Sequence, residues 1–338
     1  MDVNLRGSLT QVLLIEDSSQ VGHARRMAQQ LAETLGFDSA DAGRVALVAT
    51  ELASNILKHA VRGELHLRVY DSAGFSAVEI IAVDRGPGFD LHSSMRDGFS
   101  SVGTQGIGLG AIERQADVFD VHVDGRGAVV LTRFFPRNCK TRDLRIGINQ
   151  HSLHDDPACG DVWSLAVHGE QISALIIDGL GHGEDAEVAA RAGEVEFIRQ
   201  PFDRAEHVLE EMHHAMKGTR GGAAALMQFD AASGGLRFVG IGNIGATLLD
   251  EEKNRGLASH PGIVGLQFRK AQAFEHAQVN GQLLVMYSDG LQSRWNLRDY
   301  PGLIYRHPAV IAAVLHRDYC RGRDDVTVLV IAMEAFNA

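Results

Sequence analysis

The 338-residue chain is 45% hydrophobic and has a formal net charge of −11, from 43 Asp and Glu against 32 Lys and Arg. Chains beyond about 250–300 residues usually divide into separate cores, so this length predicts two domains. The acidic balance, without a basic run that could neutralise a row of phosphates, argues against nucleic acid as a partner. Cys139, Cys159 and Cys320 are too scattered for a disulfide framework or a paired zinc site. No apolar run reaches the ~20 residues that cross a bilayer, so we expect a cytoplasmic protein without membrane contact.

The first part of the chain alternates between strand and helix patterns. In order, these patterns predict a strand over 10–16, helices over 17–35 and 39–59, strands over 64–71 and 77–84, a glycine-rich stretch, a helix over 111–118 and a hairpin ending near Phe135. Asp17 or Ser18 is available to cap the first helix. This succession is typical of a mixed α/β domain. The polar, basic stretch over 136–145 has no apolar periodicity and predicts a connector.

The second part is dominated by strand patterns. They fall at 163–168, 172–178, 223–229, 236–241, 246–249, 283–288 and 326–333, with helical patterns at 184–199, 205–217 and 308–317. Many strands with few helices predict sheets packed face to face and flanked by helices. We therefore expect an α+β chain with a domain over 1–138, a linker over 139–144 and a second domain over 145–338.

The helix predicted over 39–59 carries a polar pair. Glu51 and Asn55 are four residues apart and therefore share one helix face. Alone, such a pair is more often part of a solvated surface than of a site. Two downstream motifs favour a site, because glycine permits close approach of backbone to a ligand and helix N-termini bind anions. The motifs comprise Asp84, Gly86 and Gly88 after a strand, and Thr104, Gly106, Gly108 and Gly110 before a helix.

In this order the three features resemble the ATP site of the GHKL superfamily, in particular the small serine/threonine kinases of the RsbT and RsbW type. The resemblance covers about residues 8–136 and implies a Bergerat α/β sandwich. It implies that Asn55 holds Mg²⁺, that Asp84 binds the adenine amino group, and that Glu51 is the general base for a partner's Ser or Thr hydroxyl. It also implies nucleotide binding by Gly86, Gly88, Thr104, Gly106, Gly108 and Gly110. Histidine kinases share this fold but need a separate dimerisation helix that carries the phosphorylated His. No residues remain upstream to form such a helix, so a histidine kinase is disfavoured.

Four acidic residues fall at predicted strand ends in the second part. They are Asp161 after a glycine, Asp178 and Asp289 before glycines, and Asp324 before a second acid. An Asp-Gly pair alone is usually a turn. Together, the four supply the hard oxygen ligands that Mg²⁺ and Mn²⁺ prefer, and no Cys or His cluster competes for zinc.

This set resembles the PPM family of metal-dependent serine/threonine phosphatases, in the branch of SpoIIE, RsbU and RsbX, over about residues 145–334. The resemblance implies two central β-sheets flanked by helices, and two Mn²⁺ or Mg²⁺ ions that activate water. Its implied metal ligands are Asp161, Asp178, the carbonyl of Gly179, Asp289 and Asp324. Asp324 is preferred over the adjacent Asp325. His182 is a candidate proton donor to the leaving oxygen, with a glycine-flanked turn residue as the alternative.

The two resemblances imply one bifunctional switch enzyme. Its expected partner is a STAS-domain antagonist or scaffold protein of a bacterial partner-switching pathway, phosphorylated by one domain with ATP and dephosphorylated by the other. The alternative is an ATP-gated module that binds a partner without phosphorylating it, fused to an active phosphatase. Because GHKL kinases of this type often dimerise, a homodimer is also an expectation.

Overall fold

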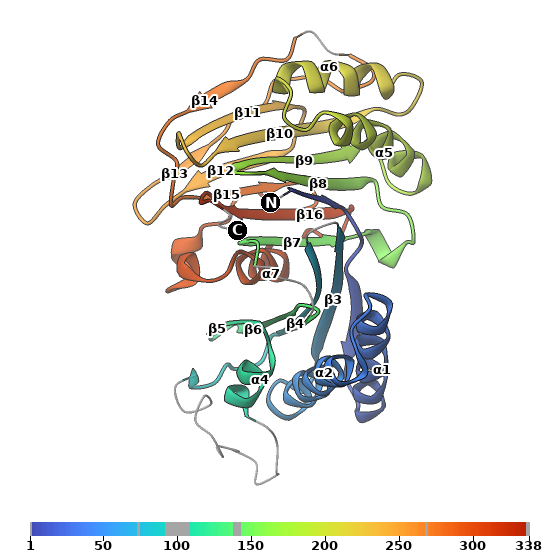
Figure 1. The fold of residues 1–338 in the computed structure, drawn as a ribbon, viewed down its shortest axis with the longest axis vertical. Helices are drawn as coiled ribbons and strands as arrows, with labels where there is room; N and C mark the ends of the chain where they lie inside the picture. The colour runs from blue at the N-terminus through green and yellow to red at the C-terminus, as the bar shows by residue number, and fades with distance from the viewer. Residues whose placement is uncertain (1, 73–74, 92–107, 138–142, 268–269, 336–338) are drawn as a thin grey trace. The chain divides into compact units, whose positions relative to one another are not determined.

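The computed structural model describes residues 2–72, 75–91, 108–137, 143–267 and 270–335 (Figure 1). Two compact units divide the chain. The helix-covered unit comprises Thr10–Asp143 and Leu297–Val314, and the two-sheet unit comprises Met1–Leu9, Leu144–Asn296 and Leu315–Ala338. The two units therefore differ from the expected domains in two places, at residues 1–9 and at residues 297–314.

The helix-covered unit contains an antiparallel five-stranded sheet in the order β2-β3-β4-β6-β5. Its strands are β2 (Gln11–Ile15), β3 (Gly63–Ser72), β4 (Phe75–Asp84), β5 (Val118–Asp124) and β6 (Gly127–Phe134). Its helices are α1 (Ser18–Thr34), α2 (Ser39–His59) and the short α4 (Leu109–Gln115). The helix expected over 111–118 thus begins and ends earlier, because Val118 pairs with Arg133 as the first residue of β5.

Local chemistry explains where the two long helices begin. The Asp17 carboxylate accepts a hydrogen bond from the Ser19 amide (2.8 Å), while the Gln20 side chain accepts one from the Asp17 amide (2.9 Å). This reciprocal capping box satisfies amides that have no partner within α1. Asp38 caps α2 in the same way by accepting from the Asp41 amide at 2.8 Å.

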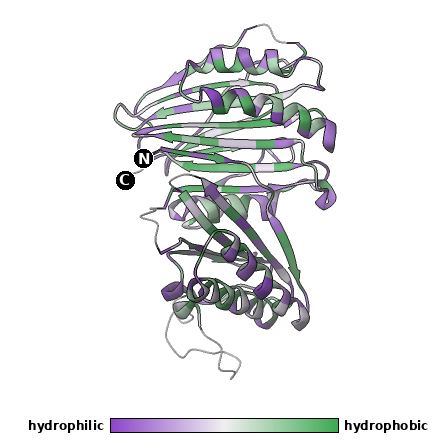
Figure 2. Cartoon of the chain, turned by 45° about the vertical axis from the view of Figure 1, so that its right-hand side comes forward, coloured by the Kyte–Doolittle hydropathy of each residue, from purple (hydrophilic) through white to green (hydrophobic). Residues whose placement is uncertain are grey.

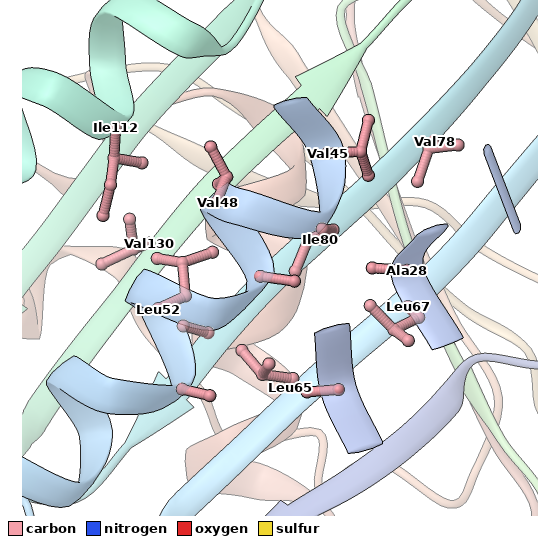
Figure 3. Close-up of a cluster of buried hydrophobic side chains, with 14 of the residues drawn as sticks. Ala28, Val45, Val48, Leu52, Leu65, Leu67, Val78, Ile80, Ile112 and Val130 are labelled. Carbon is pink, nitrogen blue, oxygen red and sulfur yellow. The ribbon is translucent and has the colours of Figure 1, made fainter. Parts of the chain in front are cut away.

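The core of this unit lies between α1, α2 and the sheet. Leu52 of α2 is 1% exposed and packs in one cluster with Leu65 of β3 and Ile80 of β4, both fully buried (Figure 3). The 3.6-residue repeat of apolar positions in α2 meets the two-residue repeat of the strands. Most polar residues of α2 are consequently exposed or half-buried, whereas Asp41 in the first turn is buried.

Residues 297–314 belong to the helix-covered unit although the sequence predicted them in the second domain. They include η2 (Leu297–Asp299), η3 (Leu303–Tyr305) and the start of α7 (Pro308–Tyr319). The Asp120 carboxylate accepts a hydrogen bond from the His307 amide at 2.5 Å, and the His307 ring lies 2.8 Å from the Asp143 carboxylate. Asp143 also pairs with Arg133, whose guanidinium is fully buried and reaches Glu79 as well. These contacts join segments that lie far apart in the sequence.

The two-sheet unit contains a six-stranded sheet, β1-β8-β9-β10-β11-β14, and a five-stranded sheet, β13-β12-β15-β16-β7, with every strand pair antiparallel. The strands are β1 (Asp2–Arg6), β7 (Ile146–His151), β8 (Asp161–His168), β9 (Gln171–Gly179), β10 (Gly222–Asp230), β11 (Gly235–Ile241), β12 (Gly245–Leu249), β13 (Asn254–Gly256), β14 (Phe274–His276), β15 (Leu283–Tyr287) and β16 (Val326–Ala332). The short η1 (Leu153–Asp155) follows β7. Helices α5 (Glu184–Arg199) and α6 (Ala205–Ala215) pack on the six-stranded sheet.

Strand β1 was missed because only two of its residues are apolar. Val3 and Leu5 alternate with exposed residues and are 1% and 3% exposed, and Val3 lies opposite Val167 of β8. Strands β7, β13 and β14 were missed as well. Figure 2 shows the apolar residues that run along the central strands, whereas the helices present polar outer faces. The strand and helix patterns predicted for the interior of this unit are all present as elements of its two sheets and their helices.

Replacing Leu52 by Ala tests the core of the helix-covered unit. The lost packing and the cavity should lower the free energy of unfolding by about 2–5 kcal/mol. Leu47→Ala is the matched control on the same helix, since Leu47 is 39% exposed, and its cost should stay below about 1 kcal/mol. Hydrogen exchange of the α2 amides by mass spectrometry should accelerate strongly only for Leu52→Ala. Equal acceleration in both variants would contradict this assignment of the core.

Candidate functional site

Acidic side chains gather at the strand ends of the two-sheet unit. Asp161 begins β8 and lies directly opposite Asp178 near the end of β9. Asp161 is 2% exposed and accepts a hydrogen bond from the Ser288 hydroxyl at 2.6 Å. The Ser288 hydroxyl in turn accepts from the Thr327 amide at 2.9 Å. Asp161 of the six-stranded sheet is thus held by a residue at the end of a strand of the five-stranded sheet.

Two further acids come from the ends of strands in the five-stranded sheet. Asp289 follows β15 and Asp324 precedes β16, and both line a cavity of about 490 Å³. The Asn243 side-chain amide donates a 2.7 Å hydrogen bond to Asp289. Asn243 belongs to the glycine-rich stretch after β11, so that stretch positions an acid of the cavity.

Asp325 has a different place from Asp324. It is 3% exposed, and its two carboxylate oxygens accept from the Leu153 amide (2.7 Å) and the Gly160 amide (2.6 Å). Asp325 therefore ties the segment before β8 to the start of β16. Both of its oxygens already have backbone partners, while Asp324 faces the cavity.

The acids perturb one another's ionisation. Burial, with the charges of Asp161, Asp289, Asp324 and Asp325, raises the pKa of Asp178 to about 9. Burial also raises the pKa of Asp161 to about 7, against the opposing hydrogen bonds from Ser288 and Thr327. Burial and the Asp324 charge raise the pKa of Asp289, which Arg321 and Asn243 partly offset. A positive charge among these carboxylates would relieve the repulsion.

The donor set fits a hard divalent cation in its chemistry. Carboxylate and carbonyl oxygens are the preferred ligands of Mg²⁺ and Mn²⁺. In the part of the chain that the structure describes, no three His, Cys, Asp or Glu side chains are already close enough to hold one ion. Metal binding by Asp161, Asp178, Gly179, Asp289 and Asp324 therefore stays a prediction. The same holds for proton donation by His182, an exposed residue between Gly181 and Gly183, which both have positive φ.

The helix-covered unit brings its motif residues to one end of the sheet. Asp84 ends β4 and accepts hydrogen bonds from the Gly86 amide (2.8 Å) and the Ala128 amide (3.2 Å). A side chain at Gly86 would meet Ala60, the C-cap of α2, at 2.9 Å. The turn after β4 therefore packs against the end of the helix that carries Glu51 and Asn55, both half-buried. Gly88 has φ of 74°, which favours glycine.

Sequence reasoning missed one residue of this arrangement. A Cβ at Gly127 would lie 2.0 Å from the Asp84 carbonyl oxygen, and Gly127 has φ of 134°. The Gly-Arg-Gly turn between β5 and β6 was the available signal. Gly127 is thus the residue that lets the β5–β6 turn approach the motif aspartate.

The second glycine motif lies only partly within the described residues. Thr104 and Gly106 fall outside them. Gly108 is the N-cap of α4 and Gly110 is buried inside this helix, whose Leu109 and Ile112 join the core next to α2. Nucleotide binding by these glycines stays a prediction, as do the roles of Glu51, Asn55, Asp84, Gly86 and Gly88.

Comparison with known proteins identifies the first half. Residues 15–134 match the family model of the histidine kinase-like ATPase domain. The serine/threonine-protein kinase RsbT of Bacillus subtilis (strain 168) is 36% identical over 109 residues, which span 32% of this chain and 82% of RsbT. The chain belongs to the RsbT family. The expected resemblance is thereby confirmed.

Solved structures add the fold of the second half. A fragment of SpoIIE from Bacillus subtilis, with the PP2C phosphatase domain and part of the regulatory domain, matches 96% of this chain and 98% of its own with a TM-score of 0.50 at 16% identity. A chain from the bacterial stressosome, a modular system adapted to control secondary messenger signalling, matches 56% of this chain and 99% of its own, with a TM-score of 0.52 at 25% identity. The expected fold class is confirmed: an ATPase domain of the GHKL type is joined to a PPM-phosphatase fold. Among the described residues, no helix is long and apolar enough to cross a membrane.

The raised pKa values predict how pH and metal affect stability. Both Asp161 and Asp178 have an ordinary pKa of 3.8, so above about pH 4 the folded chain keeps protons that the unfolded chain releases. Without divalent metal, these groups should make the free energy of unfolding fall as the pH rises from about 5 to 8. Mn²⁺ competes with these protons, so it should raise the melting temperature more at pH 8 than at pH 5.

Thermal melts at both pH values, with Mn²⁺ and with EDTA, check this expectation. Asp178→Asn removes one titrating group and should reduce the pH dependence of the Mn²⁺ effect. Asp185→Asn is the control, because Asp185 is exposed and pairs with Arg220. An Mn²⁺ effect of equal size at both pH values in the wild type would contradict the role of the acid cluster.

Proposed function

We propose that the chain is a bifunctional switch enzyme that phosphorylates a Ser or Thr of a STAS-domain partner and hydrolyses the resulting phosphoester. The observation that carries the proposal is the coexistence of two sets of polar residues. One set lies on α2 and at the end of β4 in the helix-covered unit, and the other lies at strand ends of the two-sheet unit. Membership of the RsbT family supports kinase activity in the helix-covered unit. The buried acid cluster supports metal-dependent hydrolysis in the two-sheet unit.

In the helix-covered unit, this proposal gives each residue a separate task. Asp84 binds the adenine amino group while its carboxylate also holds the Gly86 amide. Asn55 holds Mg²⁺ and Glu51 accepts the proton of the substrate hydroxyl. Glu51 and Asn55 are one helical turn apart on α2, so base and metal site are fixed by the same rigid element.

In the two-sheet unit, Asp161, Asp178, Asp289 and Asp324 supply oxygen ligands to two Mg²⁺ or Mn²⁺ ions, aided by the Gly179 carbonyl. Bound divalent ions would lower the pKa of water and neutralise charge on the phosphoryl group. The hydrogen bonds of Ser288 and Asn243 hold Asp161 and Asp289 in place. His182 would donate a proton to the leaving serine oxygen.

The proposed substrate is a STAS-domain protein. RsbT is a serine/threonine-protein kinase, and a stressosome chain is among the similar structures. Opposed activities in one chain would set the partner's phosphorylation level by the ratio of two rates. The second candidate is an ATP-gated binding module, favoured by the exposed position of the α2 end, where a partner could bind without phosphoryl transfer.

Transfer of label from ATP to the STAS protein encoded nearest this gene tests the proposal. With Mg²⁺ and Mn²⁺, label should accumulate on the partner with Asp178→Asn and stay low with the wild type, because only the variant lacks phosphoester hydrolysis. Asp185→Asn should behave like the wild type. No label with Asp178→Asn, despite ATP binding, would contradict the kinase half.

Glu51→Ala separates the two candidate functions. Loss of a general base should slow phosphoryl transfer about 10²–10⁴-fold while ATP and partner binding persist. Glu33→Ala on α1 is the control, because Glu33 is exposed and, among the described residues, its side chain accepts a hydrogen bond only from Gln29 of its own helix. Unchanged transfer in Glu51→Ala would show that another group accepts the proton.

A further inference from the structure

Beside two of the acids lies a strongly basic wall. The cavity of about 490 Å³ that contains Asp289 and Asp324 is also lined by Arg294, Arg321 and Arg323. Gln292 and Ser293 complete its lining. The acid cluster explains why this cavity would attract cations, but it gives no reason for three guanidinium groups in the same space.

The backbone builds this wall from two segments. The Arg321 amide donates to the Gly290 carbonyl at 2.9 Å, and the Gln292 amide donates to the Tyr319 carbonyl at 2.9 Å. A β-bridge between Leu291 and Cys320 lies between these two hydrogen bonds. The segment after Asp289 and the segment before Asp324 are therefore fixed side by side, so the arginines keep a constant place relative to the acids.

Ion pairs among the described residues do not neutralise these arginines. Arg294 and Arg323 have no carboxylate partner within ion-pair distance in the described ranges of the chain. Arg321 acts on Asp289, whose pKa it lowers against the effect of burial. All three residues are exposed, so a solute that enters the cavity can reach them.

Their chemistry identifies the ligand class. A guanidinium group presents several N–H donors in a planar fork that matches the oxygens of a phosphate, often in a bidentate manner. The phosphoryl group of a phosphoserine must approach carboxylates that repel it. Positive charge in the lining of the same cavity offsets that repulsion and orients the group.

We propose that Arg294, Arg321 and Arg323 bind the phosphoryl group of the phosphatase substrate beside Asp289 and Asp324. The inference rests on the proposed phosphatase function and names three specificity-determining residues for it. The ligand is the phosphoryl group itself, and not the acidic residues that flank a phosphoserine.

The double variant Arg321→Gln/Arg323→Gln tests the inference in the full-length protein with Mn²⁺. Two substrates are compared, p-nitrophenyl phosphate and a phosphoserine peptide. For both, KM and the inhibition constant of inorganic phosphate should rise about 10-fold to 100-fold, since charge-assisted hydrogen bonds to the shared phosphoryl group are lost. In the double variant Arg321→Lys/Arg323→Lys, KM and the phosphate inhibition constant should rise less than in the Gln variant. Lysine keeps the positive charge but lacks the planar fork of donors. The Mn²⁺ concentration for half-saturation should not rise.

Arg237→Gln is the matched control, because Arg237 is a partly exposed arginine of β11 paired with Glu275 away from the cavity lining. Kinetic constants of the double variant equal to those of the control would overturn the inference. A loss confined to the peptide would also overturn it, because the arginines would then recognise flanking residues. A higher Mn²⁺ requirement with unchanged KM would overturn it as well, because the arginines would then position the metal ligands and not the phosphoryl group.

Calorimetric titration with inorganic phosphate provides a measurement that needs no turnover. Phosphate binding should weaken in the double variant and persist in Arg237→Gln. If the wild type hydrolyses neither substrate, the proposed phosphatase function fails, and the titration still decides whether the arginines bind phosphate. Equal binding in the wild type and the double variant would overturn the inference by itself.

Discussion

Repulsion between buried carboxylates is the constraint on which the two-sheet unit depends. Asp161 and Asp178 are neighbours across one sheet, and the ends of the other sheet bring Asp289 and Asp324 into the same electrostatic environment. Such a cluster is costly unless protons, cations or hydrogen bonds compensate it. The fold supplies part of the compensation itself, through the Ser288 hydroxyl and the Asn243 amide. Stability that the sheets could have gained from apolar residues at these ends is given up for a charged site.

In the helix-covered unit, close approach of the backbone positions the motif acid, whereas charge dominates the site of the two-sheet unit. Asp84 is held by two amide donors, and Gly127 permits that approach because it has no side chain. Two backbone amides therefore preorganise the motif acid. The α2 helix carries the polar pair Glu51 and Asn55, and its apolar face is anchored in the core. A rigid helix and a tight turn together position polar groups more precisely than a loop alone.

Local sequence patterns were sufficient to predict those helices and strands that their own apolar periodicity defines. Helix α2 was predicted over its full length because its apolar repeat and its cap are both local. Strand β1 could not be predicted, because its pairing with β8 depends on residues far along the chain. The buried group of Glu79, Arg133 and Asp143 was likewise invisible, since charged residues normally indicate surface. In the site, Asp178 and Asp289 were visible as Asp-Gly pairs and the other acids as residues at predicted strand ends. The arginines of the cavity needed the adjacency of two segments that only the fold creates.

The first strand also has a consequence for synthesis. Because β1 pairs with β8 while β2 to β6 lie between them in the sequence, most of the helix-covered unit is inserted in the chain between two neighbouring strands of the other unit. A nascent chain must hold β1 unpaired until β8 has left the ribosome, and loop-closure entropy slows such distant pairing. During that interval the inserted unit can complete its five-stranded sheet, but it still lacks residues 297–314. A fragment that begins at residue 145 would leave an edge of β8 open to pairing with other chains.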